Sequence, residues 1–384
     1  MSPSVRSPLF GLAFGAWLAL AAPAFGADTP ASEVRTAPAK PAVNVRAKSP
    51  SASDYLEREE VRSFLKEVSE AHGIPLDWLE SEVAVARYSA LAERYTTPKP
   101  GANRRTTPEK NYLLYSKNLV NEERIAKGVE FLKRHDAAFR EAEALSGVDR
   151  YAVAAVIGIE TIYGRNMGRF RVLDALMTLS FDYTRRAAFF RSELSSFLDF
   201  CWREKISPVT VLGSYAGAIG LGQFMPSSLD AYGRDGDGDG RVDIVGSEAD
   251  AIASVAAFLR AHGWVSGIEP LYPVEADRDI YERIGAGGIT VHTTLAGLRE
   301  EGVRKTESVP LPDDEPVLLV DLPWVDVKNR RGTHWFVGTR NFAAILRYNR
   351  SYFYAAAVSA LAERIAERER SLEKSAEPSQ SPSS

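Results

Sequence analysis

Apolar positions recur with a helical period along much of this chain. In residues 54–71 they fall on one helical face, formed by Leu56, Val61, Phe64, Leu65 and Val68. The run His72-Gly73-Ile74-Pro75 interrupts that pattern, and Asp77 can cap the helix that follows. The first ordered part of the chain therefore reads as a series of amphipathic helices.

A stronger helical pattern covers residues 121–145. Its expected inward positions are Ile125, Val129, Leu132, Phe139 and Leu145. Ser146-Gly147 is expected to end this helix, and Asp149 can cap the next one. Further helices are expected over 186–204 and 250–262.

The pattern changes after Trp264, where Gly and Pro become frequent. Short runs of β-type residues follow at Gly288–Thr293, Val317–Leu322 and Thr333–Val337, before a helical pattern returns over Phe342–Ile365. The chain is therefore expected to be mainly α (α+β), with a small β-rich segment at 267–337.

The two ends of the chain have a different character. Arg6 precedes an apolar stretch over Leu9–Ala22, as in a secretory signal, with cleavage expected after Ala24 or Gly26. The alternative is a signal anchor that is never cleaved. We expect a signal peptide at 1–26, and a mature protein that is exported, periplasmic and soluble. The Ala/Pro/Ser/Lys-rich linker at 27–53 and the tail at 367–384 are expected to be disordered.

Composition narrows the function classes further. The 384 residues are 45% hydrophobic, which allows two or three domains with a large core. A net charge of −4 without a basic block argues against nucleic-acid binding. The lone Cys201 excludes an intrachain disulfide, and no cysteine near the cleavage region could carry a lipoprotein anchor. The five histidines show no zinc-type spacing, and no organic cofactor is indicated.

Glu160 is the only charged residue in the apolar run from Tyr151 to Tyr163. A carboxylate in such surroundings must be desolvated, paired or kept protonated. A protonated carboxyl near neutral pH is a general acid, as cleavage of a glycosidic bond requires. The alternative is a core glutamate bonded to a neighbouring backbone group or arginine.

A second segment, residues 213–232, combines four glycines and three alanines with aromatic residues. Small residues allow the backbone to approach a ligand closely, although they also suit a tight helix crossing. Gln223 offers both a donor and an acceptor to sugar amides and hydroxyls.

Residues 235–246 (DGDGDGRVDIVG) have the pattern of an EF-hand calcium loop. The matching positions are Asp235, Asp237 and Asp239 at 1, 3 and 5, Gly240 at 6, the Arg241 carbonyl at 7, and Asp243 at 9. Position 12, normally Glu, is Gly246, so Glu248 or Asp250 would have to supply the last ligand. Calcium is favoured over magnesium, and the alternative is an acidic turn without metal.

Four ordered blocks resemble one enzyme family: IGIETIYGRNMG, LDALMTLSFDYTRRAAFF, GSYAGAIGLGQFMPSS and RYNRSYFYAAAV. Together they resemble the lytic murein transglycosylases of the membrane-bound B type, glycoside hydrolase family 103. The resemblance spans residues 54–366 and is weakest in the β-rich segment.

The resemblance implies a lysozyme-like core with a flanking α domain and a small β domain. The expected divisions are an α domain at 54–146, the catalytic core at 147–266 with its EF-hand-like loop at 235–250, the β-rich segment at 267–337 and a helical return at 338–366. It also implies the reaction, which is cleavage of the β-1,4 bond between N-acetylmuramic acid and N-acetylglucosamine without water, leaving a 1,6-anhydro end.

By position, Glu160 matches the family's single catalytic acid and base. The residues that match the glycan-binding positions are Tyr115, Ser214, Gln223, Tyr348 and Asn349. Arg185 and Arg186 match an arginine pair that could meet peptide or lactyl carboxylates, although ion pairing on the surface is an equal alternative. The resemblance also favours Asp250 as the last calcium ligand. Phe258 departs from the tyrosine expected there.

Two other functions remain open at this stage. A lysozyme-type hydrolase would need a second carboxylate, for which Asp174 and Asp182 are the nearest downstream candidates. A catalytically silent peptidoglycan-binding protein is the other alternative, although Glu160 argues against it. The expected partners are peptidoglycan glycan strands, with cell-wall synthases as candidate protein partners, and the protein is expected to be monomeric.

Overall fold

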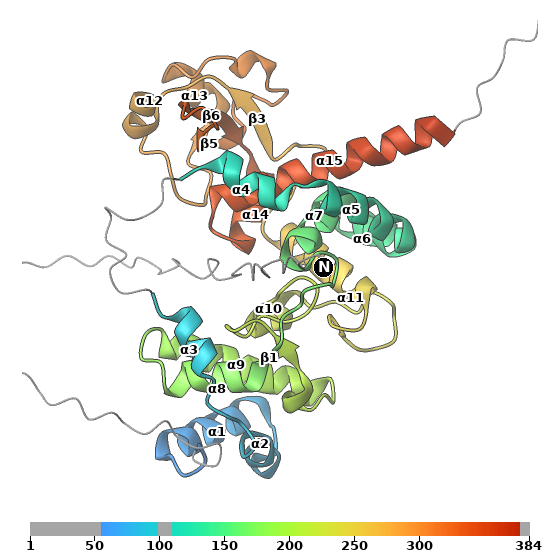
Figure 1. Ribbon diagram of the computed structural model, residues 1–384, viewed down its shortest axis with the longest axis vertical. Coiled ribbons are helices and arrows are strands. Elements are labelled where there is room, and N and C mark those ends of the chain that lie inside the picture. Colours follow the sequence, from blue (N-terminus) through green and yellow to red (C-terminus); the bar gives the residue numbers. More distant parts are fainter. Residues whose placement is uncertain (1–54, 99–109, 377–384) are drawn as a thin grey trace, which may run out of the picture.

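The computed structural model describes residues 55–98 and 110–376 (Figure 1). The expected signal peptide at 1–26 and linker at 27–53 lie outside the described residues. Within the described ranges, no helix combines the length and the apolar character needed to cross a membrane.

The lower part of the view in Figure 1 is a group of helices around α8 and α9. Its elements are α1 (Glu59–His72), α2 (Leu76–Val83), α3 (Ala90–Thr96), α8 (Val172–Phe181) and α9 (Ala187–Arg203). Asp182, at the end of α8, accepts hydrogen bonds from Tyr55 (2.6 Å) and Arg58 (2.8 Å). The amphipathic face of α1 is buried as predicted. Asp77, however, lies inside the first turn of α2 and not at its cap.

A second group of helices surrounds α7 in the upper half of the view. It contains α4 (Tyr112–Leu119), α5 (Glu122–Arg134), α6 (Asp136–Ser146), α7 (Arg150–Thr161), α14 (Arg340–Tyr348) and α15 (Tyr352–Ala376). Helix α15 packs along α5 and α7. The segment 55–146 thus contributes helices to both groups, and the division into domains proposed above stays a prediction.

Between the two groups lie α10 (Pro226–Tyr232) and α11 (Glu248–Ala261), together with the short strands β1 (Phe170–Arg171) and β2 (Leu212–Gly213). Strands β1 and β2 pair antiparallel, with Phe170 opposite Gly213. A 3-10 turn at Pro208–Thr210 precedes β2. These connecting elements carry the glycine-rich segment and the acidic loop.

The β-rich segment forms an antiparallel sheet in the order β3-β6-β5-β4. Its strands are β3 (Leu271–Val274), β4 (Thr293–Thr294), β5 (Pro316–Val325) and β6 (Arg331–Gly338), and its helical pieces are α12 (Arg278–Arg283), α13 (Leu295–Glu300) and a 3-10 turn at Thr306–Ser308. Alternate residues of β5 serve two cores, because Leu318, Val320 and Leu322 join the main core while Val317 and Leu319 join a small separate one. The predicted strands at 317–322 and 333–337 are confirmed, whereas most of 288–293 is irregular.

Two helical predictions need correction. The helix expected over 121–145 is two helices, because His135 leaves the helical conformation between α5 and α6. The break resets the phase of the apolar pattern, so Leu145 is 82% exposed and not inward. The helix expected over 342–365 is likewise split between α14 and α15.

The expected disordered tail is also wrong in part, since α15 continues to Ala376. Buried contacts explain this extension. Both carboxylate oxygens of Glu369 accept from Arg150 (2.9 and 3.0 Å), and one also accepts from the Tyr151 hydroxyl at 2.7 Å. Glu369 is only 5% exposed, so this cluster joins the end of α15 to the start of α7.

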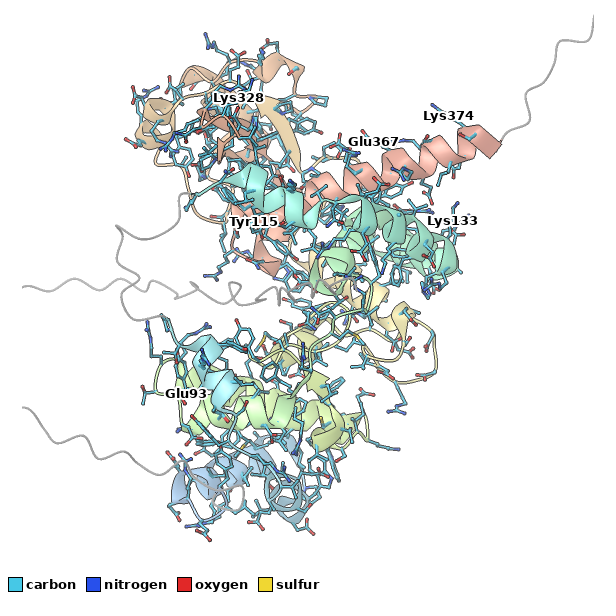
Figure 2. All side chains as sticks on the ribbon, viewed as in Figure 1. Glu93, Tyr115, Lys133, Lys328, Glu367 and Lys374 are labelled. Atoms are coloured by element: carbon cyan, nitrogen blue, oxygen red, sulfur yellow. The ribbon has the colours of Figure 1, made fainter. Side chains whose placement is uncertain are left out.

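We predict that Glu369→Ala lowers the free energy of unfolding by about 2 kcal/mol, because Arg150 and Tyr151 would lose their hydrogen bonds to a buried carboxylate and Arg150 would keep only Asp136, at 3.2 Å, as an ionic partner. Glu367→Ala is the matched control. Glu367 lies two residues away on α15 (Figure 2) and pairs with Arg364 at the surface, where such pairs contribute about 0–1 kcal/mol. Urea unfolding measures both values. Equal losses in the two variants would contradict the prediction.

Candidate functional site

Helix α7 carries Glu160 near its C-terminal end. Asp149 caps its first turn by accepting from the backbone N–H of Tyr151 (2.7 Å) and Ala152 (3.3 Å), as predicted. Residues 152–159 are all buried, so the helix is surrounded by packing up to the residue before Glu160. Glu160 itself is half-buried and is the next-to-last residue of the helix.

Tyr354, fully buried on α15, donates a hydrogen bond from its hydroxyl to Oε1 of Glu160 at 2.6 Å. Burial raises the pKa of Glu160 to about 7, and the hydrogen bond from Tyr354 lowers it in part. The carboxyl therefore exists in both protonation states near neutral pH. A group in this condition can give up a proton and take one back.

Two further tyrosines lie within electrostatic reach of Glu160. The pKa values of Tyr115 on α4 and Tyr348 at the end of α14 are raised, mainly by burial and next by the negative charge of Glu160. Both were predicted as glycan-binding residues, and the structure brings both near Glu160. Elements distant in sequence thus surround one carboxyl with phenol groups.

The glycine-rich segment forms a compact turn beside this site. Gln223 is left-handed (φ 50°), and its amide nitrogen donates to the carbonyls of Gly220 (2.9 Å) and Met167 (3.1 Å). Among the described residues, this leaves the amide oxygen of Gln223 as the group that can accept from a ligand. The Tyr348 hydroxyl donates to the carbonyl of Gly222 in the same turn.

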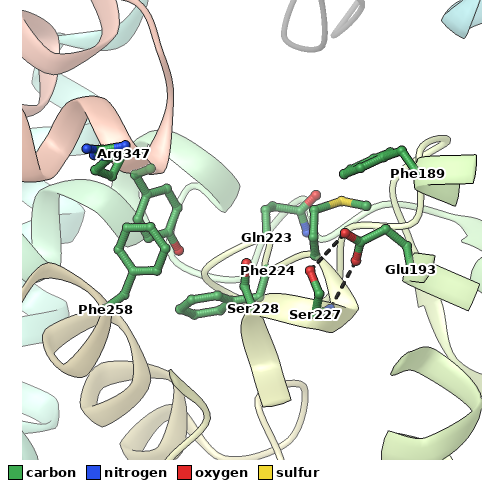
Figure 3. Close-up of a pocket in the computed structure, with 10 residues that line it drawn as sticks. Phe189, Glu193, Gln223, Phe224, Ser227, Ser228, Phe258 and Arg347 are labelled. Atoms are coloured by element: carbon green, nitrogen blue, oxygen red, sulfur yellow. Dashed lines mark hydrogen bonds between the residues drawn. The ribbon is translucent and has the colours of Figure 1, made fainter. Parts of the chain in front are cut away.

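A pocket of about 260 Å³ opens beside this turn (Figure 3). It is lined by Phe189, Glu193, Gln223, Phe224, Met225, Ser227, Ser228, Phe258, Arg347 and Tyr348. Its walls come from α9 on one side and from α11 and α14 on the other, so the pocket spans the two helical groups. Gln223 and Tyr348 are the predicted glycan-binding residues that line it.

The other predicted binding residues have different surroundings. The Oγ atom of Ser214 accepts hydrogen bonds from the backbone N–H groups of Ala216 (3.3 Å) and Ala218 (2.9 Å). Asn349 is half-buried at the end of α14. Arg185 and Arg186 are exposed, and the Arg186 guanidinium lies over the ring of Phe189 at 4.2 Å, at the edge of the pocket.

Sequence reasoning missed three residues of this site, namely Tyr354, Glu193 and Arg347. Glu193 is 3% exposed and accepts from the backbone N–H (3.0 Å) and hydroxyl (2.8 Å) of Ser227, while burial raises its pKa. Its neighbours include Arg191, Ser192 and Ser195, so it lacks the apolar run that distinguishes Glu160 in the sequence. Tyr354 stands in a similar apolar run.

Phe258 is buried in an aromatic cluster, with its ring centroid 4.7 Å from that of Tyr348 and 6.1 Å from that of Phe224. A phenylalanine supplies the packing at this position without a hydroxyl group. The pocket therefore lacks, at this position, the hydroxyl that a tyrosine would supply.

The acidic loop brings three of its predicted ligands together. Asp235, Asp237 and Asp250 each place a carboxylate oxygen within 4.8 Å of the others. Asp250 is 1% exposed and accepts from the backbone N–H groups of Gly236 (2.9 Å) and Asp243 (2.6 Å). It therefore supplies the carboxylate at the end of the loop that Gly246, at position 12, lacks. A set of carboxylate oxygens fits a hard cation such as calcium.

Asp239 and Arg241 lie outside that group of three. A carboxylate oxygen of Asp239 accepts from the backbone N–H of Arg241 at 2.9 Å. The Arg241 guanidinium donates to the carbonyl of Glu204 at 2.6 Å, which attaches the loop to the end of α9.

The acidic loop is connected to the end of α7, beside Glu160, through one backbone and one side-chain hydrogen bond. The Ile244 carbonyl accepts from the N–H of Leu221 at 3.2 Å. The Leu221 carbonyl accepts from the hydroxyl of Thr161 at 3.0 Å, and Thr161 adjoins Glu160 in α7. The loop therefore supports the glycine-rich turn that lines the site.

The two candidate second carboxylates serve other contacts. Asp174 accepts from the backbone N–H of Arg87 at 2.8 Å and lies 3.5 Å from the Arg171 guanidinium. Asp182 binds Tyr55 and Arg58, as described above. Both aspartates thus attach the N-terminal helices to α8.

Comparison with known proteins gives consistent matches. The family model described as the transglycosylase SLT domain matches residues 57–363. The membrane-bound lytic murein transglycosylase B of Escherichia coli (strain K12) is 32% identical over 313 residues, which cover 81% of this chain and 83% of that protein.

Solved structures agree in fold. The soluble lytic transglycosylase SltB1 from Pseudomonas aeruginosa has a TM-score of 0.72 at 36% identity, covering 81% of this chain and 99% of its own. The Escherichia coli lytic transglycosylase Slt35 in complex with calcium has a TM-score of 0.71 at 31% identity, covering 83% and 96%. These matches confirm the predicted fold, which is mainly α with a lysozyme-like helical core and a small β-rich part.

We predict that the raised pKa of Glu160 makes the folded state less stable as pH rises from about 4.5 to about 7, because the folded state holds a proton that the unfolded state releases. Glu160→Gln removes this dependence. The free energy of unfolding of the variant, relative to that of the wild type, should increase by up to about 3 kcal/mol between pH 4 and pH 8.

Denaturant unfolding at several pH values measures this difference. Glu141→Gln is the control, since it makes the same chemical change at an exposed position on α6. A difference for Glu160→Gln that does not vary with pH would contradict the prediction.

Proposed function

The chain belongs to the transglycosylase SLT family of peptidoglycan-cleaving enzymes, and we propose that Glu160 alone acts first as its acid and then as its base. This proposal rests on the surroundings and the raised pKa of the Glu160 carboxyl. It is half-buried, its pKa is raised to about 7, and tyrosines surround it.

In the first step, protonated Glu160 donates to the oxygen that links N-acetylmuramic acid to N-acetylglucosamine. The bond between C1 of the muramoyl sugar and that oxygen breaks, and an oxocarbenium-like centre develops at C1. The departing N-acetylglucosamine keeps the proton as its 4-hydroxyl. The hydrogen bond from Tyr354 stabilises the carboxylate that this step leaves behind.

In the second step, the Glu160 carboxylate removes the proton from the 6-hydroxyl of the same muramoyl sugar. The oxygen of that hydroxyl attacks C1 and closes a 1,6-anhydro ring, so no water is consumed and Glu160 regains its proton. General acid and base assistance contributes about 10²–10⁴ in rate, and positioning of the sugar supplies the remainder.

The residues proposed to bind the glycan are Tyr115, Ser214, Gln223, Tyr348 and Asn349. Gln223 would accept a hydrogen bond from a sugar hydroxyl or amide, because its two N–H groups already bind the backbone. Arg186, held over Phe189 at the edge of the pocket, and its neighbour Arg185 are proposed to meet carboxylates of the lactyl or peptide groups.

Calcium is the proposed structural metal. Asp235, Asp237 and Asp250 would hold it, with Asp239 and the Arg241 carbonyl completing the set as the loop tightens. The bound ion would neutralise neighbouring carboxylates. The Slt35 structure in complex with calcium supports this assignment.

The site of action is proposed to be the periplasm. The support is the sequence from Arg6 to Ala22, which has the charge and apolar pattern of a secretory signal. The substrate would be peptidoglycan glycan strands, with cell-wall synthases as candidate partners and a monomer as the working form.

We predict that digestion of murein by this protein releases fragments with 1,6-anhydromuramoyl ends, which mass spectrometry separates from reducing ends by the mass of one water. Glu160→Gln should lower the rate at least 10²-fold, because the amide can neither donate nor accept this proton. Reducing ends would instead indicate a hydrolase, and full activity of Glu160→Gln would show that another group is the acid.

We predict that saturating calcium raises the melting temperature relative to chelator, because binding to the folded state alone stabilises it. Asp237→Asn should weaken this effect. Asp314→Asn, an exposed change in a different loop, should not. An unchanged melting temperature at saturating calcium would overturn the assignment.

A further inference from the structure

Helix α7 ends at Thr161, the residue after Glu160, and an unusual turn follows it. Ile162 (φ 54°) and Tyr163 (φ 55°) are both left-handed, and Gly164 (φ 86°) follows. A residue with a Cβ atom pays about 1–2 kcal/mol for this conformation, and for a β-branched residue it is rare. Two such residues in succession persist only if surrounding contacts fix them.

Arg124 and Tyr163 provide those contacts. Arg124 is 5% exposed, and its Nε donates to the Gly158 carbonyl (3.1 Å) while Nη1 donates to the Asn118 carbonyl (2.8 Å). The Tyr163 hydroxyl donates to the Arg124 carbonyl at 3.1 Å. Gly158 and Tyr163 lie on either side of Glu160 in the chain, so these bonds connect both flanks of Glu160 to α5.

Two glycines make room for the Tyr163 ring. A Cβ atom at Gly158 would collide with the Tyr163 hydroxyl, and one at Gly128 on α5 would come within 2.6 Å of it. The ring also packs on Phe131 of α5, with 5.3 Å between centroids. Tyr163 is therefore inserted between α5 and α7, where its position is closely defined.

We propose that Arg124 and Tyr163 are positioning residues, which hold the left-handed turn and so direct the Glu160 carboxyl toward the reacting sugar. This inference rests on the proposed role of Glu160. A carboxyl that must reach two different sugar oxygens in turn needs a fixed helix end, and displacement by about 1 Å can cost about 10²-fold in rate. Neither residue is proposed to touch the substrate.

Tyr163→Phe tests this inference, because it removes the hydroxyl bond to α5 and keeps the ring. We expect kcat to fall about tenfold while KM changes less than twofold. We also expect the alkaline limb of the pH profile to move to lower pH, because a loosened turn admits water to Glu160. The tyrosines that face Glu160, which are Tyr115, Tyr348 and Tyr354, have raised pKa values and stay neutral across this range.

Tyr151→Phe is the matched control. It removes a phenol hydrogen bond of 2.7 Å, to Glu369, from the opposite end of the same helix. This variant should lower the melting temperature and leave kcat and the pH profile unchanged. Arg124→Met should reduce kcat more than Tyr163→Phe does, and its melting curve shows whether it folds.

The outcomes separate this inference from the proposed function. A Tyr163→Phe enzyme with wild-type kcat and pH profile would overturn the positioning role, and so would an equal loss of kcat in Tyr151→Phe. If Glu160→Gln is inactive in the same assay, the role of Glu160 stands whichever result Tyr163→Phe gives. If Glu160→Gln is fully active, the proposed function itself fails.

Discussion

One carboxyl group held half-buried at the end of an apolar helix is the constraint on which the rest of this structure depends. Removing Glu160 from water favours its protonated form, and the Tyr354 hydroxyl keeps its ionised form accessible. Neither effect would suffice alone. Full exposure would leave the group ionised near neutral pH, and complete burial without a donor would make the carboxylate too costly to form.

The fold brings together the groups that surround Glu160. The tyrosines around Glu160 come from α4, α14 and α15, so the chain must fold back on itself from both directions. The β-rich segment lies between α11 and α14 in the sequence, and β5 contributes one face to the main core. The small sheet therefore helps to fix the elements that follow it.

Local chemistry explains which parts of this arrangement could be predicted. Glu160 was visible as an isolated charge in an apolar run, and the Asp149 cap and the strands near residues 320 and 335 follow from short-range rules. Tyr354 was missed because its role depends on a partner 194 residues away. Leu145 and the end of α15 were misjudged because a helix break and the buried Arg150–Glu369 pair are tertiary effects.

The distance along the chain between Glu160 and Tyr354 also determines when, during synthesis, the site around Glu160 can be completed. Tyr354 belongs to the last helix, and the far end of that helix is anchored to α7 through Glu369. A growing polypeptide that has reached the sheet already contains Glu160 but lacks the hydroxyl that completes its surroundings. The surroundings of Glu160 are thus completed only after α15 has been made and has packed along α7.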